Sequence, residues 1–155
     1  MMMTFVFIFY MATNMVPGNV DQFKVEAQNP DDKTDTIILD FNRNKDGRWK
    51  VVPRHKTDDV MLFKFDERGN FMMQDGLKGK ENTYPLLSKM KMTKNHKKWL
   101  KVTQVTFKDA KSDGADEKKI VFNIVKKGKS KRTIKVDESQ SQDIGALPEM
   151  TVIWK

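Results

Sequence analysis

The fold is decided by three segments, WLKVTQVTFKD (residues 99–109), KKIVFNIVKKG (118–128) and KRTIKVD (131–137). Side chains alternate between the two faces of a β-strand, so a half-buried strand has apolar residues at every second position. Ile120, Phe122 and Ile124 follow this rule, as do Ile134 and Val136. The segments therefore predict antiparallel strands joined by short connections.

The first of these segments changes its pattern halfway. Leu100 and Val102 share one parity, whereas Val105 and Phe107 share the other. A β-bulge near Thr103–Gln104 would explain the change, because an extra residue reverses the faces. A long regular strand that is apolar on both faces explains it equally well, and the sequence leaves both interpretations open.

Further short strands are expected outward from this region, separated by Gly, Pro, Asn and Asp. They cover residues 23–27, 35–41, 48–52, 60–65, 71–74 and 150–154. Residues 78–83 are polar and predict a loop, and residues 84–98 are compatible with a helix or a strand. The pattern predicts an all-β fold, an antiparallel β-sandwich or barrel-like fold of about eight to ten strands, with at most one or two short helices.

The N-terminal residues form a separate apolar run. Residues 1–16 contain no charged side chain, and the most apolar part is Phe5–Tyr10. This run is shorter than the ~20 residues of a spanning helix, and it lacks the basic start of a secretory signal. We expect residues 1–16 to be an apolar arm or strand, which pairs within the domain or docks on a neighbouring subunit. Residues 17–155 are expected to form a single β-sandwich domain.

The composition limits the chemistry that the chain can perform. There is no cysteine, which excludes disulfides, cysteine nucleophiles and thiolate metal sites. Absence of cysteine also favours an intracellular location over secretion, and small size and β content suggest a virion as the other location. His55 and His96 are the only histidines and lie in polar sequence without a catalytic motif. We therefore expect no enzymatic activity, no cofactor and no metal.

One local motif resembles half of a calcium-binding loop. Asn42, Asn44 and Asp46 alternate before Gly47, but Pro53 stands where that loop needs a bidentate Glu. A hairpin turn containing Asp-Gly explains the same residues without a metal.

Positive charge is concentrated in one region. The net charge is +8, yet residues 77–132 contain 17 Lys or Arg against 5 Asp or Glu, and the rest contains 12 basic and 16 acidic residues. We predict that two clusters in this region bind a partner or a polyanion. They are Lys89, Lys91, Lys94, Lys97, Lys98 and Lys101 around Trp99, and Lys126, Lys127, Lys129, Lys131 and Arg132.

These features favour a non-enzymatic structural or interaction subunit of a larger assembly, a viral particle being one setting. It would bind protein partners through its basic face and its apolar N-terminal arm. One alternative is a single-stranded nucleic-acid-binding domain, and another is a small-ligand or carbohydrate-binding sandwich that exposes Trp49 or Trp154. A solvated lysine-rich surface without a partner explains the same charge pattern.

Overall fold

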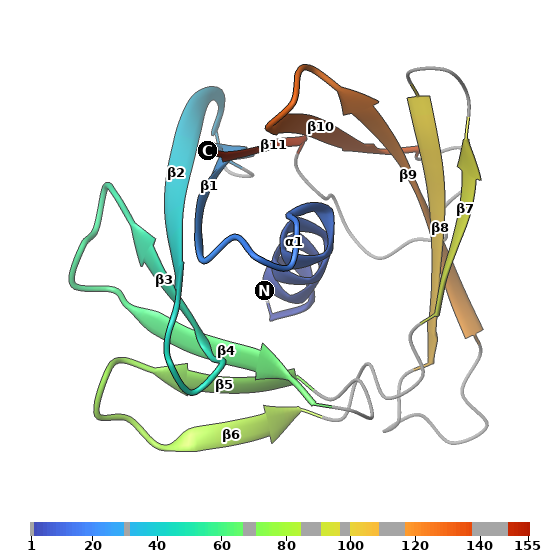
Figure 1. Cartoon of the computed structure of the whole chain (residues 1–155). Coiled ribbons are helices and arrows are strands. Elements are labelled where there is room, and N and C mark those ends of the chain that lie inside the picture. Colours follow the sequence, from blue (N-terminus) through green and yellow to red (C-terminus); the bar gives the residue numbers. More distant parts are fainter. Residues whose placement is uncertain are drawn as a thin grey trace.

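Most of the chain forms one antiparallel sheet that curls around a helix (Figure 1). The structure, a computed structural model, describes residues 2–29, 32–66, 71–84, 91–96, 100–108, 117–137 and 149–155. The elements in these ranges are α1 (Met2–Met15), β1 (Gln22–Asn29), β2 (Asp32–Arg43), β3 (Trp49–Pro53), β4 (Met61–Phe65), β5 (Phe71–Asp75), β6 (Glu81–Tyr84), β7 (Lys91–His96), β8 (Leu100–Lys108), β9 (Glu117–Lys126), β10 (Lys131–Val136) and β11 (Met150–Trp154).

The sheet has eleven strands among the described residues, in the order β6-β5-β4-β3-β2-β1-β11-β10-β9-β8-β7. Two runs of consecutive hairpins, β1 to β6 and β7 to β10, are joined by the C-terminal strand β11 between β1 and β10. The predicted all-β antiparallel class is confirmed. The described strands form a single sheet rather than the two sheets of a sandwich, and β6 and β7 are its edges, so it is not a closed barrel.

Two of the open alternatives are resolved by the strand pairing. Strand β8 keeps one continuous register with both neighbours from Leu100 to Lys108, so it has no bulge near Thr103–Gln104. Residues 91–96 form a strand rather than a helix, while residues 85–90 and 97–99 lie outside the described ranges. Residues 78–83 were expected to be a loop, but Glu81–Tyr84 pair with β5 as an edge strand.

The N-terminal run is a helix rather than a strand, and the expectation that it docks on a neighbouring subunit as an arm stays a prediction. Its β-branched and aromatic residues favour strands, but propensity is a weak preference that burial overrides. A helix satisfies its own backbone hydrogen bonds, so an apolar helix can lie inside the curve of a sheet without pairing with it. The last turn is supported by the Thr13 hydroxyl, which donates to the Phe9 carbonyl oxygen at 2.8 Å, and Pro17 prevents its continuation.

The helix covers the inner face of the sheet. Within α1, Ile8, Phe9, Met11 and Ala12 are buried. The Phe9 ring stacks on Phe63 of β4 with 4.6 Å between ring centroids, and it meets Phe41 of β2 edge-on at 5.6 Å. These contacts pack the described side chains of the N-terminal run against the sheet of the same chain.

Tyr10, which is partly buried, lies beside this cluster. Tyr10 meets Phe65 edge-on at 5.5 Å, and burial raises the pKa of its phenol above the ordinary value. The aromatic contacts of α1 therefore extend from β2 across β4 to Phe71 of β5.

Replacing Phe9 tests this packing. Phe9→Ala should lower the free energy of unfolding by about 3–5 kcal/mol, because it leaves a cavity among three aromatic rings. Urea denaturation followed by circular dichroism measures the loss. Leu77→Ala is the control, since Leu77 is 60% exposed and should change stability by less than ~0.5 kcal/mol. Equal effects of the two substitutions would show that α1 does not pack inside the sheet.

Candidate functional site

The turn between β9 and β10 gathers the second lysine cluster at one end of the sheet. We call residues Lys126–Arg132 the basic turn. Lys126 pairs with Arg132, and the Lys127 backbone N–H donates to the Lys131 carbonyl oxygen at 3.0 Å. Gly128 has a φ of 147°, which glycine adopts more readily than other residues. The turn is therefore tight, and its cationic residues are close in space.

Four lysines of the basic turn are exposed. They are Lys126, Lys127, Lys129 and Lys131, and none of them forms an ion pair with another residue that the structure describes. Exposed ammonium groups with no internal partner remain available to an external anion.

Arg132 has a different role from the lysines around it. Its Nη1 donates to the carbonyl oxygens of Gly128 and Lys131 at 2.8 and 2.9 Å, and its guanidinium lies 5.0 Å above the Trp154 ring. These contacts hold the turn in place and cover the indole. Arg132 therefore stabilises the structure of the basic turn more than it adds to the charge available to a partner.

The first lysine cluster is only partly brought to this end. Lys101 pairs with Ile124 of β9 and with His96 of β7, beside the basic turn. Lys94 and Lys91 pair with Thr103 and Thr106, progressively farther along β8. At ~3.3 Å per residue, Lys91 is roughly 16 Å along the hairpin from the row of His96. The remaining predicted members, Lys89, Lys97, Lys98 and Trp99, lie outside the described residues.

The two tryptophans that the structure describes are buried. Trp49 is 9% exposed and Trp154 is 8% exposed, and each ring is covered by an arginine guanidinium 5.0 Å away. The carbohydrate-binding alternative depended on an exposed indole at one of these positions and therefore loses that basis. The same burial leaves neither ring free to stack on a nucleic-acid base.

Arg43 fastens the connection that follows α1. Its Nη2 donates to the carbonyl oxygens of Gly18 and Val20 at 2.7 and 3.1 Å, and its Nε donates to the Asp21 carboxylate at 2.8 Å. The same guanidinium covers Trp49. Arg43 thus connects residues 18–21 with β2 and β3, next to the end where the basic turn lies.

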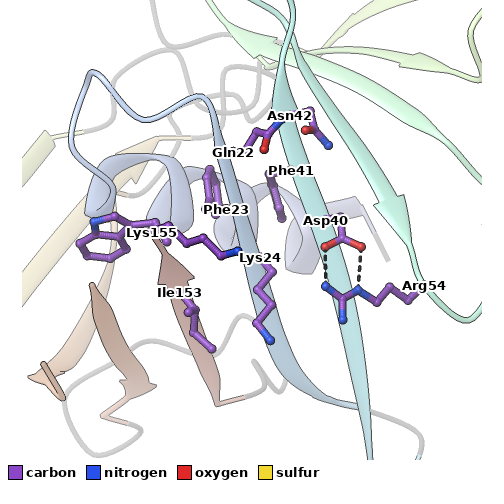
Figure 2. A pocket seen from close by; sticks show the side chains of 10 residues that line it. Gln22, Phe23, Lys24, Asp40, Phe41, Asn42, Arg54, Ile153 and Lys155 are labelled. Carbon is purple, nitrogen blue, oxygen red and sulfur yellow. Dashed lines mark hydrogen bonds and ion pairs between the residues drawn. The ribbon is translucent and has the colours of Figure 1, made fainter. Parts of the chain in front are cut away.

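A groove lies on the outer face of the three central strands β11, β1 and β2 (Figure 2). It has a volume of about 500 Å³, within the usual range of ligand pockets. The side chains that give it polar character come from alternating positions on the face opposite the core. They are Gln22, Lys24, Asp40, Asn42, Arg54 and Lys155, with Ile153 as an apolar contribution.

The groove contains one well-fixed ion pair. Arg54 donates to both Asp40 oxygens, from Nε at 2.8 Å and from Nη2 at 3.0 Å. These hydrogen bonds raise the pKa of Arg54 above its ordinary value. Lys24 lies 3.2 Å from Glu26, a half-exposed pair of the kind that contributes little to stability.

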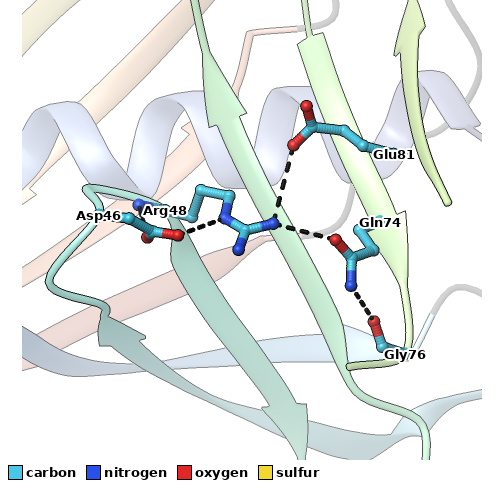
Figure 3. A network of polar contacts seen from close by, with 5 residues as sticks. All are labelled: Asp46, Arg48, Gln74, Gly76 and Glu81. Carbon is cyan, nitrogen blue, oxygen red and sulfur yellow. Dashed lines mark hydrogen bonds and ion pairs between the residues drawn. The ribbon is translucent and has the colours of Figure 1, made fainter. Parts of the chain in front are cut away.

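A second polar network lies nearer the β6 edge (Figure 3). Arg48 contacts Asp46 at 2.8 Å, the buried Gln74 at 2.9 Å and Glu81 of β6 at 3.8 Å. Hydrogen bonds from the backbone and then the side chain of Arg48 lower the pKa of Asp46. Asp46 lies in the turn of the β2–β3 hairpin, where its carboxylate is paired, so the residues that resemble a calcium loop act as a hairpin turn.

No metal site emerges from the residues that the structure describes: nowhere among them do three or more His, Asp or Glu side chains gather. His55 is exposed, as are Asp58 and Asp59. In the same ranges, no helix combines the length and apolarity needed to cross a membrane.

Comparison with known proteins gives no relative: no family model, curated protein or solved structure matches this chain. Its function must therefore be argued from its own geometry.

Arg43 and Arg54 form a matched pair for testing which arginine is structural. Arg43→Ala should lower the free energy of unfolding by about 1–2 kcal/mol, because Arg43 loses backbone acceptors and an aromatic contact as well as its carboxylate. Arg54→Ala should cost less, since Arg54 is half exposed and loses only the Asp40 pair. Urea denaturation of both variants provides the comparison. A larger loss for Arg54→Ala would contradict the role assigned to Arg43.

Proposed function

We propose that this protein is a non-enzymatic interaction subunit that binds an acidic partner through the basic turn. One observation supports this most directly: Lys126, Lys127, Lys129 and Lys131 are exposed on one tight turn, without an ion pair to any described residue. Lys101 stands beside the turn in the strand register.

The character of the charges favours general electrostatic attraction. A lysine ammonium is a point charge on a flexible stem, whereas arginine provides the planar fork used for paired recognition of phosphate or carboxylate. The arginine of this turn is occupied by backbone carbonyls and Trp154. Binding through the lysines should therefore depend steeply on salt, since exposed charges are screened beyond about 8 Å at physiological ionic strength.

An acidic protein surface suits this site better than single-stranded nucleic acid. Sites for single strands combine a cationic groove with aromatic side chains on which bases stack. Trp154, the aromatic residue at the basic turn that the structure describes, is buried beneath Arg132. The N-terminal run has no part in this proposal, because its described side chains Ile8, Phe9, Met11 and Ala12 belong to the core.

Two variants of equal charge test the proposal. Lys127, Lys129 and Lys131 are replaced by Glu in one variant, and Lys56, Lys78 and Lys80 in the other; all six lysines are exposed. Lys56 follows β3, and Lys78 and Lys80 precede β6, at the opposite end of the sheet. Binding to immobilised polyglutamate is measured as the salt concentration needed for elution.

The basic-turn variant should elute at much lower salt than the wild-type protein, and the control variant should stay close to it. Equal shifts would mean that only net charge matters, which would overturn the proposal. A wild-type protein that fails to bind polyglutamate at ~50 mM salt would also overturn it, because electrostatic binding is strongest there.

A further inference from the structure

We propose that the outer groove over β11, β1 and β2 continues the basic turn and receives an extended acidic peptide segment of the partner. This inference rests on the proposed function and adds to it a second contact surface and a partner class.

The strand register makes the two surfaces continuous. Lys131 of the basic turn pairs with Ile153, Ile153 pairs with Lys24, and Lys24 pairs with Asp40. Directly paired residues point to the same face, and Ile153 lies between the buried Val152 and Trp154, so this row is on the outer face. At ~4.8 Å between strands, Lys131 and Lys24 are about 10 Å apart across the row. A chain bound at the basic turn therefore reaches the groove without a gap.

The groove can bind both acceptors and donors. Lys24, Arg54 and Lys155 supply cations, while Asp40 supplies a carboxylate that Arg54 holds in place. The side-chain amides of Gln22 and Asn42 form no hydrogen bond to any other described residue, so both can pair with a ligand. Arg54 likewise keeps its Nη1 amino group free of hydrogen bonds within these ranges.

This mixture favours a peptide over a polyphosphate chain. An acidic peptide offers carboxylates to Lys24 and Lys131 and backbone N–H groups to Asp40 and the two amides. The phosphodiester backbone of single-stranded DNA offers acceptors but no donors, so it can pair with the lysines of this surface but has no N–H group for Asp40. The aromatic residues that line the groove, Phe23, Phe41 and Trp154, are buried and leave no ring on which a base could stack.

The surrounding ion pairs do not block such a ligand. The Lys24–Glu26 pair is half exposed, so an incoming carboxylate competes with a weak contact rather than a buried one. The Asp40–Arg54 pair is left intact, because each partner retains hydrogen-bonding capacity toward the ligand. Ile153 adds an apolar patch between the two lysines for the stem of a ligand side chain.

The test uses fluorescence anisotropy with two labelled probes at ~50 mM and ~150 mM salt. One probe is a peptide of alternating Glu and Gly of about twelve residues, which extends to ~40 Å at most. The other is an oligothymidylate of equal charge. The groove variant combines Gln22→Val and Asn42→Val and leaves the net charge unchanged. Its control combines Asn82→Val and Thr83→Val on the exposed edge strand β6.

The groove variant should weaken peptide binding about fivefold or more, the effect of losing roughly 1 kcal/mol of hydrogen bonding, while the control leaves it unchanged. Lys24→Gln should weaken it as well, and Lys24→Glu more strongly. Thermal unfolding of each variant checks that the fold is kept, and Lys24→Gln serves if Lys24→Glu does not fold.

The other outcomes separate the two proposals. Peptide binding that falls only in the basic-turn variant would overturn the groove inference and leave the proposed function standing. No peptide binding by the wild-type protein would overturn both. If oligothymidylate binds as tightly as the peptide, and the groove variant weakens the binding of both equally, the assignment of a peptide as the partner class is overturned.

Discussion

The structure depends on the apolar contact between α1 and the inner face of the sheet. A single sheet cannot bury a face by itself, so a stable domain needs a second layer. Here Phe9 of α1 packs among Phe41, Phe63 and Phe71, which would otherwise face water. Because the helix occupies the inside of the curve, the outer face and the ends of the strands are the surfaces left for partners (Figure 1).

The strands could be predicted from the sequence because alternation is a direct consequence of strand geometry. The hairpin at Asn42–Gly47 and the end of β3 at Pro53 followed from turn chemistry in the same way. The helix could not be predicted, since a short apolar run rich in Phe, Val and Ile has no period that separates a strand from a buried helix. Edge strand β6 was missed because its residues are polar and its pairing depends on β5.

Only the part of the candidate site that is contiguous in sequence could be predicted. The basic turn is contiguous in sequence, so its lysines were identified directly, whereas the role of Arg132 depends on its contacts with Trp154 and two carbonyl oxygens. The strand register places Lys91 far from the basic turn and Lys101 beside it. The amino-acid composition carries no information about this register. The groove was missed because Lys24, Asp40 and Ile153 are far apart in the chain.

Strand β11 is the element that makes the basic turn and the groove one surface. It is the only described strand that pairs with both hairpin runs, through β1 on one side and β10 on the other. Its alternation assigns Val152 and Trp154 to the core and Ile153 to the outer face, between Lys131 and Lys24. The same five residues therefore complete the core beneath α1 and set the distance between the cations above it, so the geometry of the proposed binding surface is fixed by the packing of the core.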